Sequence, residues 1–263
     1  MYPCLFGITF LDMYAIMMII GILAFTGYVY YKFKKNKLKR GLIEDIFLIL
    51  IISGCMMYIG AFGFDALFHS IKDKELKTNG ITFLGGFVTA ITTFIIMFCK
   101  IIKKEKKNLF FYLNIIVTGI VIAHAFGRIG CFCAGCCYGK PTDSVFGVVF
   151  PVGSSAYWQY GPGVKVYPTQ LFEAGFLFIL FIVLVLLKKD QFKIYLISYG
   201  TFRFLIEFLR GDDRGGLFGF LSPSQVISII LIIIGIVLFI INPNQNRLEE
   251  SETSDDLETS NVN

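Results

Sequence analysis

Two segments of the chain combine charged side chains with apolar neighbours in a pattern that could bind an anion. The first segment is Tyr199, Arg203, Glu207 and Arg210. Their spacing of i, i+4, i+8 and i+11 puts them on one face of a helix. The second segment is the Gly- and Cys-rich run 127–141, which carries Arg128 and whose glycines allow close backbone approach. Arginine makes bidentate contacts with phosphate, so Arg128 and Arg203 are candidate anion ligands. The alternative is that Arg203 and Glu207 pair and simply hold helices together.

The composition places these charges in a membrane protein. Hydrophobic residues make up 56% of the 263 residues and charged residues 16%, whereas soluble domains average about 45–50% and roughly 25%. The 29 Phe are too many for one soluble core. A soluble enzyme, a nucleic-acid-binding protein and a disordered chain are therefore excluded. In a membrane, the expected anion is a phospholipid headgroup.

Seven stretches are long and apolar enough to cross a membrane, since a helix needs roughly 20 residues to span about 30 Å. The predicted spans are residues 11–31, 42–68, 81–102, 109–127, 169–187, 192–209 and 222–241. We therefore expect an all-α integral membrane protein, with one seven-helix domain over 1–241. The first stretch is too long for the core of a signal peptide.

The charges between the spans predict the orientation. Lys and Arg cluster in 32–40, 100–107 and 188–193, after the first, third and fifth spans. With seven spans these segments share one side, which the positive-inside rule makes the cytoplasm. The N-terminus is then outside, as is the Gly/Cys-rich loop 127–168. The tail 242–263 carries six acidic residues and one Arg, and we expect it to be disordered and cytoplasmic.

Five motifs, in order along residues 12–225, resemble those of the prolipoprotein diacylglyceryl transferase family. They are Asp12-Met13-Tyr14, the segment Asn79-Gly80-Ile81-Thr82-Phe83-Leu84-Gly85-Gly86, Gly127-Arg128-Ile129-Gly130 closing on Tyr138-Gly139, Tyr167-Pro168-Thr169-Gln170-Leu171-Phe172-Glu173, and Tyr199-Gly-Thr-Phe-Arg203-Phe-Leu-Ile-Glu207-Phe-Leu-Arg210. The family also has seven spans with the N-terminus outside.

The resemblance implies a reaction and a location. Family members transfer a diacylglyceryl group from phosphatidylglycerol to the lipobox cysteine thiol of preprolipoproteins and release glycerol phosphate. The implied partners are those two substrates and the surrounding lipids of a bacterial cytoplasmic membrane, with no nucleic acid and no cofactor. This chain would be a divergent multi-pass member.

The resemblance, read onto the residues, gives two sets of candidate site residues. The catalytic set is Arg128, Arg203, Glu207 and His124. The substrate-binding set is Tyr14, Gly85, Gly86, Gly127, Gly139, Gln170, Glu173, Tyr199 and Arg210. The arginines would stabilise the leaving phosphate, and Glu207 would orient Arg203 or take the thiol proton. His124 is the candidate base in place of the family's His, which is Leu84 in this chain. His124 lies four residues before Arg128 and so on the same helix face.

Three positions depart from the family pattern. Leu84 stands where the family has His, Cys131 where it has Asn, and Cys136 where it has an acidic residue. These departures keep three alternatives open: an enzyme of the same fold with another lipid or acceptor, a non-catalytic phospholipid-binding protein, and a transporter. The absence of paired repeats with broken helices disfavours the transporter.

Four cysteines crowd into seven residues: Cys131, Cys133, Cys136 and Cys137. One interpretation is a metal site, although structural zinc sites usually draw ligand pairs from two separate segments. A second is a disulfide or thiol relay on the oxidising side. The third is that small residues suit a tight loop. We expect no metal.

Overall fold

The computed structural model describes residues 12–73, 83–187, 189–211 and 221–241. The predicted tail 242–263 lies outside these residues. The chain divides into two compact units, residues 1–29 with 110–263 and residues 30–109. The larger unit contains most of α1 (Met13–Lys35), then α4 (Leu109–Ala134), β1 (Val148–Val149), α5 (Ser155–Tyr160), β2 (Lys165–Val166), α6 (Thr169–Leu186), α7 (Gln191–Ile206), η3 (Glu207–Leu209) and α8 (Pro223–Ile241).

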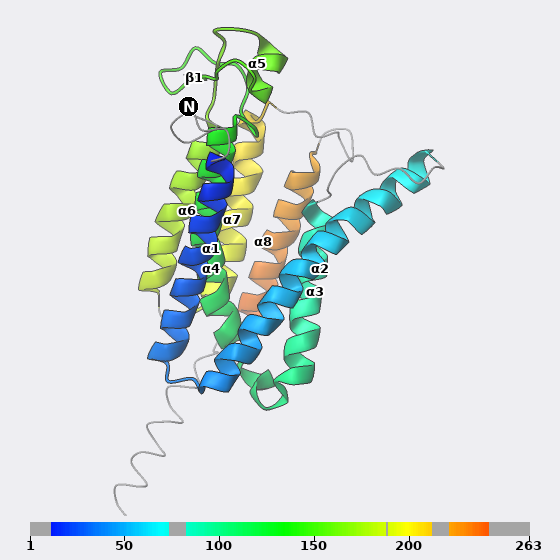
Figure 1. Cartoon of the computed structure of the whole chain (residues 1–263), viewed down its shortest axis with the longest axis vertical. Coiled ribbons are helices and arrows are strands. Elements are labelled where there is room, and N and C mark those ends of the chain that lie inside the picture. Colours follow the sequence, from blue (N-terminus) through cyan, green and yellow to red (C-terminus); the bar gives the residue numbers. More distant parts are fainter. Residues whose placement is uncertain (1–11, 74–82, 188, 212–220, 242–263) are drawn as a thin grey trace, which may run out of the picture. The chain divides into compact units, whose positions relative to one another are not determined.

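Glycines let α1 pack closely along α4 in the larger unit. A Cβ at Gly21 of α1 would lie 2.9 Å from the carbonyl oxygen of Ala123, and a Cβ at Gly119 of α4 would lie 2.8 Å from Phe25. Small residues at such crossings are the usual means by which membrane helices approach each other. The long helices α1, α4, α6 and α7 run side by side (Figure 1).

Apolar side chains from α4, α6 and α7 form the core of this unit. The buried members are Val117, Val121, Ala125, Leu177, Leu180, Leu184, Tyr195 and Leu196. Stacked rings of Phe176 and Phe202, with centroids 4.0 Å apart, join α6 to α7. Helix α8 packs on α7 at Gly200, where a Cβ would meet Ile232 at 2.9 Å. This core fixes the faces of α4, α6 and α7 that carry the predicted site residues.

A small cap joins α4 to α6. Strands β1 and β2 pair antiparallel, with Val148 opposite Val166. Ser154 begins α5 by accepting a hydrogen bond from the backbone N–H of Tyr157 at 3.2 Å. The sheet and α5 lie at one end of the helices of this unit (Figure 1).

The smaller unit is built on α2 (Arg40–Asp73) and α3 (Phe83–Ile101), which pack along each other, followed by the short helix η2 (Lys103–Asn108). Gly86 of α3 faces α2, and a Cβ there would lie 2.7 Å from the carbonyl oxygen of Met57. Close helix packing is therefore the local reason for this glycine.

Five helices in the described part of the chain are long and apolar enough to cross a membrane. They are Met13–Lys35, Arg40–Gly63, Lys103–Ala134, Thr169–Leu186 and Ser224–Ile241. Their outward surfaces expose large apolar side chains such as Leu23 and Ile179, which marks them as membrane-facing. The chain is thus a multi-pass helical membrane protein. The remaining two predicted spans correspond to shorter helices. One is α3, whose part Val88–Ile101 is apolar, and the other is the 16-residue α7.

Three local expectations need correction. Helix α4 continues to Ala134, past the predicted end at residue 127, so Arg128 is helical and the loop begins at Gly135. Helix α7 ends at Ile206 and continues as η3, and Arg210 is extended, so the predicted helix face does not reach Arg210. Lys193, expected in a basic loop, is buried in α7, and its Nζ lies 2.7 Å from Oδ1 of Asp190. A buried, paired lysine adds little to the positive charge of that loop.

Candidate active site

Glu173 of α6 is the centre of the first group of polar side chains. Its carboxylate is 1% exposed, and Oε2 lies 3.0 Å from Nε of Arg128 on α4. Oε1 accepts a hydrogen bond from the hydroxyl of Tyr199 on α7 at 3.0 Å. His124 lies one turn before Arg128, with Nε2 3.7 Å from Oε1 of Glu173 and its ring 5.4 Å from that of Tyr199. The predicted shared face of His124 and Arg128 is therefore present, and both side chains meet a buried carboxylate.

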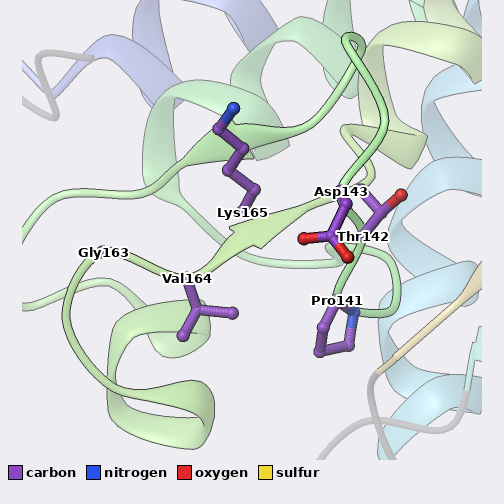
Figure 2. Close-up of a pocket in the computed structure, with 6 residues that line it drawn as sticks. All are labelled: Pro141, Thr142, Asp143, Gly163, Val164 and Lys165. Carbon is purple, nitrogen blue, oxygen red and sulfur yellow. The ribbon is translucent and has the colours of Figure 1, made fainter.

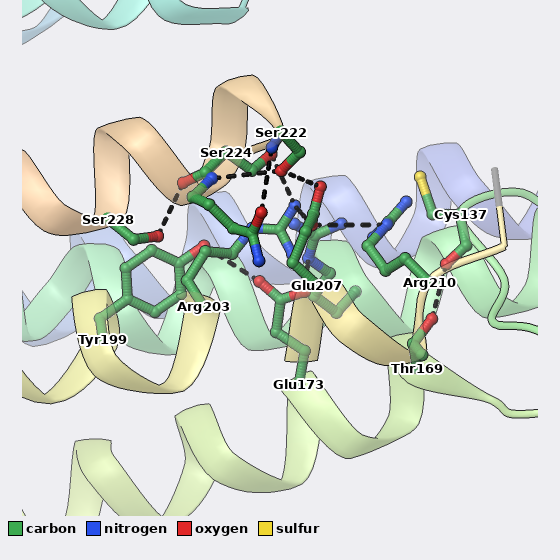
Figure 3. A network of polar contacts seen from close by, with 12 residues as sticks. Cys137, Thr169, Glu173, Tyr199, Arg203, Glu207, Arg210, Ser222, Ser224 and Ser228 are labelled. Carbon is green, nitrogen blue, oxygen red and sulfur yellow. Dashed lines mark hydrogen bonds and ion pairs between the residues drawn. The ribbon is translucent and has the colours of Figure 1, made fainter. Parts of the chain in front are cut away.

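Arg203 and Glu207 form the centre of the second group (Figure 3). Nη2 of Arg203 lies 2.8 Å from Oε2 of Glu207 and donates to the hydroxyl of Ser224 at 3.0 Å. Arg210 follows, with Nε 4.0 Å from the same carboxylate oxygen. Both Arg203 and Arg210 are buried. Two guanidinium groups thus share one carboxylate, which leaves net positive charge in a buried place.

One nitrogen of Arg203 is left over from this pairing. Nη1 is buried and has no hydrogen-bond partner among the described residues. Buried polar atoms are nearly always satisfied, so an unmatched one calls for a specific explanation. An anionic oxygen at Nη1 would satisfy it.

The first turn of α8 completes the second group from the other side. Ser222 accepts the backbone N–H of Gln225 at 3.2 Å, and Oε1 of Gln225 accepts the N–H of Ser222 at 3.0 Å. This reciprocal pair is a capping box, and Pro223 follows at the first helical position. The hydroxyl of Ser222 also donates to Oε1 of Glu207 at 2.8 Å. The start of α8 is therefore tied to the end of α7.

Arg210 is held by the loop that follows α4. Gly139 forms an isolated antiparallel bridge with Arg210 and donates its N–H to the carbonyl of Tyr167 at 2.8 Å. A Cβ at Gly139 would lie 2.7 Å from the carbonyl oxygen of Leu209, so a larger residue would push the two segments apart. Gly139, predicted to bind substrate, thus has a backbone role here: it lets Arg210 pack against the loop that follows α4.

The start of α6 anchors the cysteine loop. Nε2 of Gln170 donates to the carbonyl of Cys136 at 2.5 Å, and the hydroxyl of Thr169 donates to that of Cys137 at 2.9 Å. Figure 3 shows Arg210 between Glu207 and Cys137. Hydrogen bonds with the thiol of Cys131, then with that of Cys136, and the nearby guanidinium of Arg210 lower the pKa of the Cys137 thiol, although burial opposes the shift.

The remaining predicted residues are less closely tied to these groups. Tyr14 packs on Gly130 of α4, where a Cβ would lie 3.2 Å from its ring. Gly127 has room, since a Cβ there would meet only the sulfur of Met18 at 3.7 Å. Gly85 and Gly86 belong to α3 in the smaller unit. The side chain of Leu84 lies outside the described part of the structure.

A surface hollow of about 450 Å³ lies in the cap (Figure 2). Its lining residues are Pro141, Thr142, Asp143, Gly163, Val164 and Lys165. None of the predicted site residues contributes to this lining, so the hollow gives no support to the predicted chemistry.

The serines of the second group were not among the predicted site residues. Ser222 and Ser224 contact Glu207 and Arg203 directly. The pattern Ser-Pro-Ser-Gln at 222–225 is a recognisable helix start. That signal locates the start of α8, but it does not indicate which side chains the helix start meets.

Comparisons with known proteins agree with this arrangement of motifs. The family model for prolipoprotein diacylglyceryl transferase matches residues 3–241. The chain is 34% identical over 256 residues to phosphatidylglycerol–prolipoprotein diacylglyceryl transferase of Clostridium tetani, a match that covers 91% of this chain and 97% of that protein. It is 39% identical over 180 residues to phosphatidylglycerol–prolipoprotein diacylglyceryl transferase 2 of Clostridium perfringens, covering 66% of this chain and 67% of the relative. A Finegoldia magna protein of the same name as the first is 32% identical over 249 residues, covering 89% and 92%. The chain belongs to the prolipoprotein diacylglyceryl transferase family.

Proposed function

We propose that this protein transfers the diacylglyceryl group of phosphatidylglycerol to the lipobox cysteine thiol of preprolipoproteins. The sulfur forms a thioether with the glyceryl carbon that carries the phosphate, and the C–O bond to that phosphate breaks. Glycerol phosphate leaves with the electron pair of the broken bond. One observation carries the proposal in this member of the family. Arg203 is buried beside Arg210, and its Nη1 has no hydrogen-bond partner among the described residues.

The proposed roles follow from the contacts. Arg203 binds the phosphate through Nη1, while Glu207 and Ser224 fix its guanidinium plane through Nη2. Preorganised donors aimed at developing charge are often the largest contribution to catalysis. Glu173 fixes Arg128 in the same way from α6. Gln170 and Thr169 support the loop after α4, and Gly139 of that loop holds Arg210.

His124 is the proposed acceptor of the thiol proton. Its Nε2 lies 3.7 Å from Glu173, beyond hydrogen-bond distance, so the imidazole is oriented by its neighbours without a short bond to that carboxylate. A thiol needs less assistance than a hydroxyl, because a few per cent of it is already ionised near neutral pH. The proton would therefore pass from the lipobox thiol to His124 as the sulfur attacks.

The proposed topology has seven spans in a bacterial cytoplasmic membrane, with the N-terminus outside and the polar groups near the outer side. This orientation rests on the basic segments 32–40 and 100–107, which the positive-inside rule assigns to the cytoplasm. Single cysteines introduced at Lys37 and Lys104 should react only with reagents that reach the cytoplasm. Labelling of either position by an impermeant reagent applied from outside would contradict this topology.

Rescue of a bacterium depleted of its own transferase tests the function. The unmodified chain should restore growth and lipoprotein maturation. Arg203→Ala should fail to do so at equal membrane abundance, whereas Ser144→Ala in the cap is the matched control and should rescue. Failure of the unmodified chain, correctly inserted, would favour the alternative of another lipid or acceptor, which the cysteines at positions 131 and 136 motivate.

A further inference from the structure

The end of α4 and the following turn bring three thiols together. The sulfur atoms of Cys131, Cys136 and Cys137 all lie within 4.8 Å of one another. All three are partly buried thiols outside any disulfide, as is Cys133, which does not belong to the group. No metal was expected from the sequence, because structural zinc sites usually draw ligand pairs from two separate segments and four ligands in seven residues are poor geometry for one ion. Three of them do converge.

The convergence has a specific backbone cause. Helix α4 ends in a Schellman motif, in which the N–H of Gly135 bonds the carbonyl of Phe132 at 3.1 Å and the N–H of Cys136 bonds that of Cys131 at 3.2 Å. Gly135 has the positive φ of 71° that this motif requires. The chain is thereby folded back, and the thiol of Cys136 also donates to the carbonyl of Cys131 at 3.6 Å.

The next residue is held in an unusual conformation. Cys137 has φ of 64°, a left-handed conformation that is uncommon for a residue other than Gly, Asn or Asp. The carbonyls of Cys136 and Cys137 accept hydrogen bonds from Gln170 and Thr169 of α6. The turn is therefore fixed from outside, and the three sulfurs are positioned by backbone contacts that do not depend on a ligand.

The surroundings suit an anionic cluster. The guanidinium of Arg210 lies beside Cys137 (Figure 3) and interacts electrostatically with its thiol. Arg128 interacts electrostatically with Cys131 and Cys137. Thiolate sulfur is the soft ligand preferred by Zn²⁺ and Cu⁺. Three thiolates on a divalent ion give a single negative charge, which these two arginines can balance.

We propose that Cys131, Cys136 and Cys137 bind one soft, thiophilic metal cation through their three sulfur atoms. Binding of a divalent ion replaces three S–H protons by three metal–sulfur bonds, releases three protons, and involves no change of oxidation state. Water fills the fourth position of a tetrahedral ion. The bound ion ties the turn at Gly135 to the last turn of α4, between Arg128 and Arg210. This inference is independent of the proposed reaction.

Titration of the purified full chain with Cd²⁺ tests the proposal. The reduced, chelator-treated protein in detergent should gain sulfur-to-cadmium charge-transfer absorbance that saturates at one ion per chain. Zn²⁺ should compete for the site, and binding should strengthen as pH rises because protons are released. Cys131→Ser, Cys136→Ser and Cys137→Ser should each lose this saturable binding, whereas the matched control Cys133→Ser should keep it.

Alkylation of the unmodified chain provides a readout that does not depend on folding of the variants. Zn²⁺ should protect Cys131, Cys136 and Cys137 from N-ethylmaleimide and leave Cys133 reactive, as mapped by peptide mass spectrometry. The proposal is overturned by the absence of saturable Cd²⁺ binding, by binding that survives all three Ser substitutions together, or by equal protection of Cys133.

Discussion

Replacing Glu173 by Gln should destabilise the protein strongly, because it removes one partner of a buried ion pair. The carboxylate is 1% exposed and Arg128 14%, with 3.0 Å between Nε and Oε2. Removing one partner of a buried pair costs about 3–5 kcal/mol, since the other charge stays buried and uncompensated. The amide oxygen of Gln can still accept the hydrogen bond from the hydroxyl of Tyr199. The loss of stability therefore measures the contribution of the negative charge of Glu173.

Thermal unfolding in detergent, followed by intrinsic fluorescence, measures this effect. Tyr199→Phe is the matched control, because it removes one hydrogen bond to the same carboxylate and leaves the ion pair. Its cost should be smaller, about 1.5–3 kcal/mol for a hydrogen bond to a charged group. Glu173→Gln should therefore lower the unfolding temperature more than Tyr199→Phe does.

A double substitution tests the reasoning itself. In Glu173→Gln with Arg128→Gln neither buried charge remains, so the destabilisation should be less than the sum of the two single effects. The expected coupling energy is roughly 0.5–3 kcal/mol. Strictly additive losses, or a Glu173→Gln protein as stable as the unmodified one, would refute the buried ion pair as the organising contact of this group.

Three further substitutions have expected outcomes. Arg203→Lys should lower the rate of glycerol phosphate release by about 10²-fold or more. The positive charge remains, but lysine lacks the forked guanidinium that can bind both Glu207 and a phosphate. Equal rates would contradict the phosphate role. His124→Ala should lower the same rate by about 10²–10⁴-fold if the imidazole takes the thiol proton, and an unchanged rate would remove it as the base. Ser222→Ala should reduce stability by about 0.5–2 kcal/mol through loss of the capping box at the start of α8, measured by thermal unfolding; a protein as stable as the unmodified one would show that the cap contributes nothing.

Local periodicity predicted the contacts within single helices. The i, i+4 spacing predicted the ion pair of Arg203 with Glu207. The same spacing predicted that His124 and Arg128 share one helix face, and both side chains contact Glu173. The apolar stretches likewise predicted the helices, because burial in lipid requires internally satisfied backbone.

Contacts between helices could not be read from the sequence. Nothing in the order of residues shows that Glu173 of α6 meets Arg128 of α4, or that Ser224 of α8 meets Arg203 of α7. These depend on the rotation of each helix about its axis, which tertiary packing determines. The convergence of three of the four cysteines was not predicted for a related reason. The Gly-rich run was interpreted as a loop from residue 127, whereas α4 continues to Ala134 and Gly135 ends it by folding the chain back.

The central claim is tested most directly by product analysis with the purified full chain. Mixed micelles of phosphatidylglycerol and a synthetic lipobox peptide would be incubated with the protein, and mass spectrometry would follow the peptide and released glycerol phosphate. The claim predicts a diacylglyceryl thioether on the peptide cysteine and one glycerol phosphate per modified peptide, with neither product from a Cys→Ser peptide. No thioether and no release, while the Clostridium tetani relative forms both under the same conditions, would contradict it.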